Sequence, residues 1–231
     1  MNRVFREEKK FLISVDEFLS LSGKLGNVML SDPHNGTHGY TIRSLYFDTV
    51  YDRDCGEKQA GVELRRKLRL RCYDPKASYA MLEMKQKQGC NQLKRSLRMR
   101  REDAIRLTKG DYAPLLAYSE PFAAECYALM KLQCYLPKTV VEYKRKAYIA
   151  KENKIRVTFD HHVVSTESCF DLFCEGLNMN PVLDPCHVIL EVKFNGFLLG
   201  YIKELLDPVN GSELAVSKYI LARQNGYQTR F

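Results

Sequence analysis

The chain has 231 residues, of which 45% are apolar and 28% are charged, and it contains 14 Tyr and 11 Phe. This composition excludes a disordered chain, and no segment approaches the roughly 18 apolar residues of a membrane-spanning helix. Because the N-terminus lacks the apolar run of a signal peptide and the eight cysteines are widely spread, we expect a cytoplasmic protein with reduced thiols. The net charge of +8 predicts attraction to polyanions, a class that includes nucleic acid, anionic lipid, nucleotides and phosphate chains.

The N-terminal part predicts a strand, a helix and a loop. Residues 5–13 alternate in a way that puts charged side chains on one face of a strand. Ser14 and Glu17 have the spacing of a capping box, which opens a helix that runs to about Gly26. Residues 31–39 are rich in Asp, Pro, Asn, Gly and His, and they form the loop that follows.

Hairpins dominate the next part of the chain. Alternating, β-branched and aromatic residues predict strands at Tyr40–Asp48, Val62–Tyr73, Tyr79–Gln88 and Gln92–Arg100. A helical stretch opens at Arg101, and a second helix covers Ser119–Cys134 with Ser119 as its N-cap and Pro121 in its first turn.

The last third predicts strands again and then helix. The strands are Thr139–Ala150, Lys154–Asp160 and His187–Asn195, and the chain closes with Phe197–Leu206 and a helix over Ser212–Asn225 that stops at Gly226. The total is about seven or eight strands and four helices, with no repeat or linker, so we expect one domain over residues 1–231. Hairpin-linked strands pair antiparallel, and closure removes sheet edges. The expected fold is therefore α+β, a closed antiparallel β-barrel flanked by helices.

One strand carries an unusual charged face. Lys67, Arg69 and Arg71 occupy successive positions on that face with no acidic residue between them. Their mutual repulsion favours an anionic ligand, because Arg binds phosphate oxygens with two parallel hydrogen bonds and Lys supplies a point charge. Glu63 and Arg65 precede these cations on the same face of this strand. Charged faces on other strands contain Glu83, Lys85, Lys87, Tyr143, Arg145, Lys154, Arg156, Thr158, Asp160, Glu191 and Lys193. A solvated outer face is the alternative explanation for each strand taken alone.

Three strands also carry the pattern Glu-x-Lys, which puts a carboxylate and an ammonium on the same face. The pairs are Glu8 with Lys10, Glu83 with Lys85, and Glu191 with Lys193. Surface salt bridges explain each pair singly. Carboxylates inside a phosphate-binding cavity also suit Mg²⁺ or Mn²⁺, which prefer one or two carboxylates together with phosphate oxygens.

Eight short motifs in order resemble the VTC domain, the polyphosphate polymerase branch of the CYTH-like triphosphate tunnel metalloenzymes. They are Arg6-x-Glu8-x-Lys10-Phe11, Ser44-Leu45-Tyr46-Phe47-Asp48-Thr49, Lys67-Leu68-Arg69-Leu70-Arg71-Cys72-Tyr73, Leu82-Glu83-Met84-Lys85, Val141-Glu142-Tyr143-Lys144-Arg145, Ile155-Arg156-Val157-Thr158-Phe159-Asp160, Ile189-Leu190-Glu191-Val192-Lys193 and Ser217-Lys218-Tyr219. The resemblance spans nearly the whole chain. Arg6 stands where the wider superfamily has the first glutamate of Glu-x-Glu-x-Lys, which favours the polymerase-like branch.

The resemblance implies a tunnel of antiparallel strands and assigns roles to matched positions. The residues implied to act in catalysis are Lys10, Arg69, Arg71 and Lys218. Those implied to bind phosphate are Lys85, Lys94, Tyr143, Arg145, Arg156 and Ser217. Glu191 matches the ligand of a metal ion, Mn²⁺ or Mg²⁺. Lys94 and Arg95 are adjacent cations, and the sequence leaves open which of them faces the tunnel.

The leading functional hypothesis is a polyphosphate polymerase that transfers the terminal phosphate of ATP onto inorganic polyphosphate. Phosphoryl transfer needs little covalent chemistry from a protein, so positioned cations and a metal can be sufficient. Hydrolysis of triphosphate or a nucleoside triphosphate, and non-catalytic polyphosphate binding, are the alternatives. Nucleic acid is not an expected partner, because strand alternation separates Arg145 from Lys144 and Lys146. Oligomeric state and recruitment by membrane-bound partner proteins stay open.

Overall fold

The computed structural model describes residues 6–89, 91–207, 209 and 217–228. The described residues form two compact units. The first unit draws on Met1–Thr41, Tyr143–Val163 and Leu183–Ser217, and the second on Ile42–Glu142, Val164–Val182 and Lys218–Phe231. Strands β7 (Tyr135–Ala150) and β8 (Ile155–Thr166) continue from one unit into the other. Within the described ranges, no helix is long and apolar enough to cross a membrane.

The first unit is an antiparallel sheet in the order β1-β10-β8-β7, with β2 added to β7. Its other elements are β1 (Arg6–Ser14), α1 (Val15–Val28), β2 (Leu30–Ser31), η2 (Glu152–Lys154), β10 (His187–Asn195) and α5 (Gly200–Leu206). The predicted capping box is confirmed, because the Glu17 amide donates to Ser14 Oγ at 3.1 Å and the Ser14 amide donates to Glu17 Oε2 at 2.7 Å. Helix α1 therefore begins directly after β1 and returns over the sheet.

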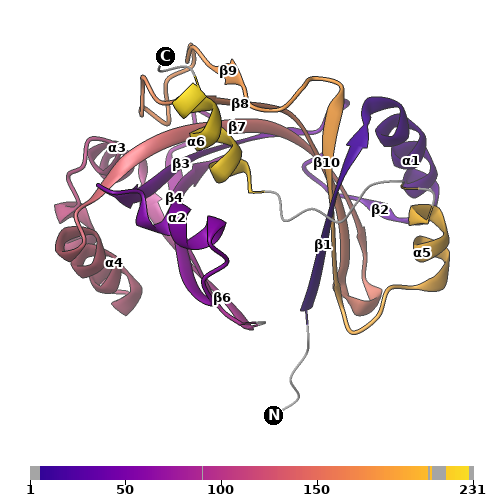
Figure 1. The fold of residues 1–231 in the computed structure, drawn as a ribbon, viewed down its shortest axis with the longest axis horizontal. Coiled ribbons are helices and arrows are strands. Elements are labelled where there is room, and N and C mark those ends of the chain that lie inside the picture. The colour runs from indigo at the N-terminus through magenta and orange to yellow at the C-terminus, as the bar shows by residue number, and fades with distance from the viewer. Residues whose placement is uncertain (1–5, 90, 208, 210–216, 229–231) are drawn as a thin grey trace. The chain divides into compact units, whose positions relative to one another are not determined.

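Helices α1 and α5 cover one face of this sheet (Figure 1). Leu25 on α1 and Ile202 on α5 are fully buried with Phe159 and Leu190, which lie on β8 and β10. Because strand side chains alternate between faces, the neighbours of these apolar residues point to the opposite face. That opposite face carries the charged residues of the unit.

The second unit is an antiparallel sheet in the order β7-β3-β4-β5-β6, and β9 pairs with the end of β8. Its elements, apart from those shared, are β3 (Tyr40–Thr49), α2 (Arg53–Gln59), β4 (Leu64–Cys72), β5 (Tyr79–Gln88), β6 (Asn91–Arg100), α3 (Arg101–Thr108), η1 (Ala113–Ala117), α4 (Pro121–Leu132), β9 (Asn180–Pro181) and α6 (Lys218–Gln228). Only the first two residues of β3 belong to the other unit.

Helices α3 and α4 pack on one face of the β4-β5-β6 sheet and bury its apolar side chains (Figure 1). Leu68, Leu82 and Leu97 have no more than 2% of their surface exposed, and they pack with Leu107 of α3 and Cys126 of α4. The alternation again leaves the basic residues of β4 on the opposite face. The two units thus repeat one arrangement, in which helices cover the apolar face and the other face is charged.

The sequence predicts a closed barrel, but hydrogen bonds do not close the sheet. Its hydrogen-bonded path runs from β1 to β6, and no pairing joins these two strands among the described residues. The α+β class and the antiparallel pairing are confirmed, whereas the closed barrel is not. The described chain holds ten strands and six α-helices, more than expected, partly because β2 and β9 are only two residues long.

Several predicted boundaries were wrong. The N-cap of α4 is Glu120 and not Ser119, although Pro121 does begin the helix. Helix α6 begins at Lys218 and continues through Gly226 to Gln228, so this glycine does not end it. Residue Phe5 of the first predicted strand and Ser212 of the last predicted helix lie outside the described residues.

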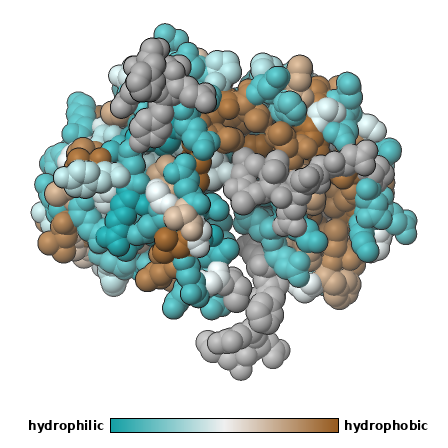
Figure 2. Space-filling model, viewed as in Figure 1, coloured by the Kyte–Doolittle hydropathy of each residue, from teal (hydrophilic) through white to brown (hydrophobic). Residues whose placement is uncertain are grey.

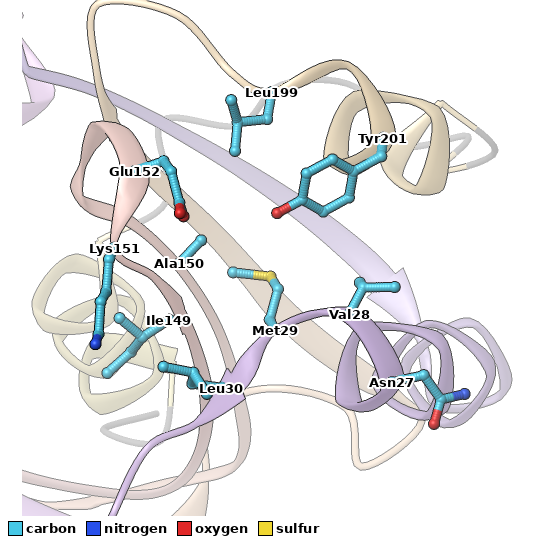
Figure 3. Close-up of a pocket in the computed structure, with 10 residues that line it drawn as sticks. All are labelled: Asn27, Val28, Met29, Leu30, Ile149, Ala150, Lys151, Glu152, Leu199 and Tyr201. Atoms are coloured by element: carbon cyan, nitrogen blue, oxygen red, sulfur yellow. The ribbon is translucent and has the colours of Figure 1, made fainter.

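A cavity of about 610 Å³ in the first unit lies beside its apolar core. Figure 3 shows side chains from the end of α1, from β2, from the turn after β7 and from the start of α5 around it. Figure 2 shows hydrophobic surface near α5 in the same unit. The lining contains one cation, Lys151, next to Glu152, so this cavity is not suited to a phosphate chain.

Candidate functional site: two charged clusters

The charged face of the second unit centres on Glu83 of β5. Register places Arg69 directly opposite Glu83 and places Lys67 opposite Lys85 on the same face. Arg69 donates from Nε to Glu83 Oε2 at 2.7 Å, and Lys94 of β6 donates to Glu83 Oε1 at 2.5 Å. Arg71 Nη1 lies 3.8 Å from Glu83 Oε2. We call these four residues the Glu83 cluster: Glu83, Arg69, Arg71 and Lys94.

Glu83 is 5% exposed, so its ionisation depends on its partners. Burial alone would raise the pKa of Glu83, but the positive charges of Arg69, Arg71 and Lys94 lower it to about 2. The carboxylate is therefore ionised at neutral pH. One negative charge against three positive charges leaves the cluster with a net charge of +2, which favours an anionic ligand.

Two hydroxyl groups of β3 also face this cluster. Arg71 donates from Nε to Ser44 Oγ at 3.2 Å, and Arg69 Nη1 donates to the Tyr46 hydroxyl at 3.4 Å. Tyr46 is 2% exposed. Burial opposes ionisation of Tyr46, but Lys67, Arg69 and Arg71 outweigh that effect and lower its pKa to about 7.

The choice between Lys94 and Arg95 is resolved by β6. Lys94 contacts Glu83 on the charged face, whereas Arg95 donates from Nη2 to Glu125 Oε1 of α4 at 2.6 Å on the helix-covered face. Lys85 is the register partner of both Lys67 and Lys94, so it lies among the same cations.

The charged face of the first unit has a different composition. Glu8 and Lys10 of β1 lie opposite Lys193 and Glu191 of β10. Lys10 Nζ is 2.7 Å from Glu8 Oε1 and 3.6 Å from Glu191 Oε2, and Lys193 contacts both carboxylates. Burial would lower the pKa of Lys10, but Glu191 and Glu8 raise it above its ordinary value. We call these four residues the Glu191 cluster.

Two further ion pairs occupy the same unit. Arg145 donates from Nε and Nη2 to the two oxygens of Asp160 at 2.6 and 2.7 Å, and Asp160 is fully buried. The guanidinium also lies 5.4 Å from the centre of the Tyr143 ring. Arg145 is part of β7, and Gly39 approaches its backbone so closely that a Cβ on Gly39 would lie 2.2 Å from the Arg145 carbonyl oxygen. With a φ of +84°, this position requires glycine.

Arg156 of β8 forms the second pair. It donates from Nη2 to Asp32 Oδ2 at 2.6 Å and to the Tyr40 hydroxyl at 3.0 Å. Asp32 also accepts a hydrogen bond from the backbone amide of His34, and the His34 ring nitrogen Nδ1 lies 2.9 Å from the same carboxylate oxygen. In the first unit, each predicted phosphate-binding arginine therefore has a carboxylate partner.

Comparison with known proteins identifies the family of this chain. Residues 5–227 match the VTC domain family. The chain belongs to the VTC domain family. The resemblance carried by the eight motifs is thereby confirmed. No curated protein matches the chain.

Two solved structures share the fold of this VTC domain. A candidate adenylate cyclase from Bacillus halodurans has a TM-score of 0.53 and 16% identity, with 92% of this chain and 95% of the other covered. A candidate adenylyl cyclase from Hippeastrum, described as having a dominant triphosphatase activity, has a TM-score of 0.54 and 14% identity, with 94% and 95% covered. At these identities the likeness shows the fold.

The carboxylates of the VTC domain fit a divalent metal through their donor chemistry. Glu8 and Glu191 offer oxygen atoms, which Mg²⁺ and Mn²⁺ prefer, and such ions complete their shell with water and substrate phosphate. The described residues contain no group of three or more His, Cys, Asp or Glu side chains arranged to hold a metal. A bound ion would therefore depend on phosphate oxygens and would compete with Lys10 and Lys193 for the carboxylates.

The predicted residues fall in both units. Lys10, Tyr143, Arg145, Arg156 and Glu191 belong to the first, and Arg69, Arg71, Lys85 and Lys94 to the second. Ser217 and Lys218 lie where the last segment of the first unit ends and that of the second begins, and Lys218 is the first residue of α6.

Sequence reasoning overlooked the residues that hold these side chains in place. Glu83 was considered as the carboxylate of a Glu-x-Lys pair that would suit a metal, but not as the shared partner of Arg69, Arg71 and Lys94. Tyr46, Asp48 and Tyr219 were quoted only as parts of motifs. The fully buried Asp48 accepts a hydrogen bond from the Tyr219 hydroxyl at 2.7 Å. Asp48 ends the predicted strand Tyr40–Asp48 and Tyr219 lies in the predicted helix Ser212–Asn225, but no local pattern indicated that these two residues would contact each other.

Proposed function

We propose that this VTC domain is a metal-dependent polyphosphate polymerase that transfers the terminal phosphoryl group of ATP to inorganic polyphosphate. The observation that supports it is the Glu83 cluster, in which three cations share one buried carboxylate. An excess of fixed positive charge on a rigid sheet binds phosphate oxygens without reorganisation, and phosphoryl transfer is accelerated mainly by such positioning.

The residues of the proposal have separate tasks. In the second unit, phosphate oxygens would be bound by Arg69, Arg71, Lys85 and Lys94. In the first unit, they would be bound by Arg145 and Arg156, beside their carboxylate partners, together with Tyr143 and Ser217. Lys10 and Lys218 would orient the transferred group. Glu191, with Glu8, would hold Mn²⁺ or Mg²⁺, which supplies charge neutralisation on the phosphate oxygens when bound.

The chemistry of the proposed step is a displacement at phosphorus. A terminal phosphate oxygen of the acceptor chain forms the new bond to the γ-phosphorus of ATP, and the bond to the bridging oxygen breaks. ADP leaves with that oxygen, so the acceptor chain gains one phosphate. The nucleophile belongs to the acceptor, and no side-chain nucleophile is needed.

Hydrolysis is the second candidate function. The same cations would bind the triphosphate while a water molecule replaced the acceptor chain. The shared fold with a Hippeastrum protein described as having triphosphatase activity favours keeping this candidate. Non-catalytic binding of polyphosphate is the third, and it requires only the excess positive charge of the Glu83 cluster.

The test is to incubate the purified protein with ATP and Mn²⁺ and to resolve the products by gel electrophoresis and phosphate assay. Glu191→Gln and the double variant Arg69→Ala/Arg71→Ala probe the two clusters. The matched control is Arg95→Ala/Arg106→Ala, which removes two positive charges from the second unit at positions paired with Glu125 and Asp111.

Each outcome selects one function. Long phosphate chains that are lost in both cluster variants and retained in the control would support the polymerase. Free phosphate without chains would show a hydrolase. No turnover, combined with salt-sensitive binding of tripolyphosphate that the Arg69→Ala/Arg71→Ala variant loses, would show a binding module.

A further inference from the structure

Two adjacent histidines on β8, His161 and His162, form a pair that the proposed function does not use. In a regular strand, the side chains of successive residues point to opposite faces of the sheet. Here the two rings come together instead. Their Nδ1 atoms are 2.6 Å apart, and their ring centres are 4.9 Å apart at an interplanar angle of 71°. Both residues belong to the first unit.

The backbone of His162 brings the two rings together. The pairing of β8 with β10 extends from Arg156 to Asp160 and ends directly before the histidines. His162 then has a φ of +49°, in the left-handed region that residues other than glycine seldom adopt. Such a residue interrupts the alternation of a strand and re-aims a side chain, as a β-bulge does. Backbone strain of this kind is concentrated at functional sites, so the pair calls for a functional explanation.

The polar contact of His161 is directed to His162. His161 is 8% exposed, and its ring centre lies 5.4 Å from that of Phe18 on α1. Its Nε2 is buried and makes no hydrogen bond of good geometry in the part of the chain that the structure describes, although the backbone of His38 is close enough to favour the protonated ring. Packing against Phe18 would be served as well by an apolar residue. The contact between the two Nδ1 atoms therefore distinguishes histidine at this position.

The buried ring is neutral at neutral pH. Burial lowers the pKa of His161 to about 4, and the charges of His162 and Lys144 act in the same direction against that of Asp160. A neutral imidazole has one nitrogen that carries a proton and one that carries a free lone pair, which accepts a hydrogen bond or binds a metal ion. Without a metal, one Nδ1 of the pair donates its proton to the other.

The separation of the two Nδ1 atoms also fits two ligands of one metal ion. An imidazole nitrogen lies about 2.0 Å from such an ion, so two ligands at a right angle are about 2.8 Å apart. At the tetrahedral angle they are about 3.3 Å apart. The observed 2.6 Å is nearer to the right angle, which is the arrangement of Cu²⁺ and Ni²⁺ sites, whereas Zn²⁺ prefers the tetrahedron.

We propose that His161 and His162 bind one Cu²⁺ or Ni²⁺ ion through their Nδ1 atoms, at a site separate from the carboxylates proposed to hold Mn²⁺ or Mg²⁺. The two sites select different ions, because imidazole suits copper and nickel while Mn²⁺ and Mg²⁺ prefer oxygen. Binding shifts the shared proton to Nε2 of the ring that carried it, so both rings stay neutral. The described residues hold no group of three or more His, Cys, Asp or Glu side chains around a metal, so water completes the shell. His162 is exposed, which gives the ion access from solvent.

The test is a calorimetric titration of the full chain with Ni²⁺, after treatment with a chelator and dialysis. The unsubstituted protein should bind one Ni²⁺ ion per chain. His162→Asn should weaken this binding at least about tenfold, since loss of even an outer-shell partner of a metal site costs that much. Asparagine tolerates the left-handed region, so this variant keeps the backbone of the pair. The matched control is His187→Asn, which removes an imidazole from β10 in the same unit and should bind Ni²⁺ normally.

Electron paramagnetic resonance of the protein with one equivalent of Cu²⁺ identifies the ligands, once the thiols have been alkylated to prevent their oxidation. The spectrum should show a tetragonal ion coupled to two nitrogen nuclei, and His162→Asn should lose this coupling. His161→Leu should lose Ni²⁺ binding as well; thermal unfolding checks that it folds, and His162→Asn decides alone if it does not. If the unsubstituted protein binds Ni²⁺ no more tightly than His162→Asn, the pair is only a hydrogen bond between imidazoles and the proposal is wrong. Loss of binding in His187→Asn alone would place the ion elsewhere and would also overturn it.

Discussion

The two units use similar residues on their charged faces, but they balance charge differently. In the first unit the Glu191 cluster has two carboxylates and two ammonium groups, and Arg145 and Arg156 each have an aspartate partner. In the second unit Arg69, Arg71 and Lys94 contact one shared carboxylate, that of Glu83. The first face is neutral within these groups, whereas the second has a net positive charge.

This difference indicates different chemical capacities. Balanced carboxylates and ammonium groups stabilise one another without a ligand, and the carboxylate oxygens are also suitable donors to a metal. Cations that share one carboxylate repel each other until an anion arrives. Ligand binding should therefore affect the stability of the second unit's face more strongly, and substitutions can test this contrast.

The largest effect is expected from the most buried pair of the first unit. Arg145→Met leaves the fully buried Asp160 without its bidentate partner and should lower the free energy of unfolding by about 4 kcal/mol. Arg156→Met is the comparison, because Arg156 is 34% exposed and Asp32 keeps its bonds from His34; the expected loss is about 1 kcal/mol. Urea unfolding measures both. Equal losses would show that burial does not set the strength of these pairs.

In the second unit the carboxylate is the group whose loss matters most. Glu83→Gln leaves Arg69, Arg71 and Lys94 without their shared counter-charge and should cost about 3 kcal/mol of unfolding free energy. Tripolyphosphate should raise the melting temperature of this variant more than that of the unsubstituted protein, since the anion replaces the lost charge. Glu125→Gln is the control, because Glu125 pairs with Arg95 on the helix-covered side. An equal response to tripolyphosphate in all three proteins would contradict the charge excess.

The same carboxylate predicts a dependence of stability on pH. Burial opposes its ionisation, yet Arg69, Arg71 and Lys94 hold the pKa of Glu83 at about 2, below its ordinary value of 4.5. Between these values the unfolded chain binds more protons than the folded chain, so stability rises with pH. The contribution, about 3 kcal/mol, is complete above pH 4.5 and is lost as pH falls toward 2. Acid unfolding of Glu83→Gln should lack this component, and an unchanged acid profile would show that Glu83 is not the group responsible.

Much of the fold could be predicted because the strands alternate clearly. Tyr79–Gln88 and His187–Asn195 were predicted with their observed bounds, since apolar and charged residues alternate over Leu82–Lys85 and over Leu190–Phe194. Helix α2, residues Arg53–Gln59, was missed because it is short, contains glycine and has little apolar periodicity. Its start depends instead on Asp48, which accepts hydrogen bonds from the amides of Asp54 and Cys55.

The candidate site was predictable in its residue types and less so in its pairings. Alternation placed Arg69, Arg71 and Glu83 on charged faces, and the register then brought them together. No local pattern could show that Asp32, from a loop, would pair with Arg156, because 124 positions separate them in sequence. The choice between Lys94 and Arg95 likewise depended on β6 register and on Glu125 of α4.

The smallest expected effect concerns a single proton on Tyr46. Burial disfavours its phenolate, but Lys67, Arg69 and Arg71 lower its pKa to about 7, so the phenolate is much more accessible at neutral pH than in a free tyrosine. A bound tripolyphosphate would neutralise these cations and raise that pKa, so binding near pH 7 should be accompanied by proton uptake at Tyr46.

Calorimetry in buffers of different ionisation enthalpy measures that uptake. The phosphate ligand also exchanges protons, so the informative quantity is the difference between the unsubstituted protein and Tyr46→Phe. Tyr51→Phe, at a residue that is 92% exposed, is the matched control and should behave like the unsubstituted protein. Identical proton uptake in Tyr46→Phe would place the exchange elsewhere. A smaller proton uptake in Tyr46→Phe than in the unsubstituted protein would show that the phenol of Tyr46 takes up the proton. The cations of the second unit would then stabilise both the phenolate and the bound phosphate.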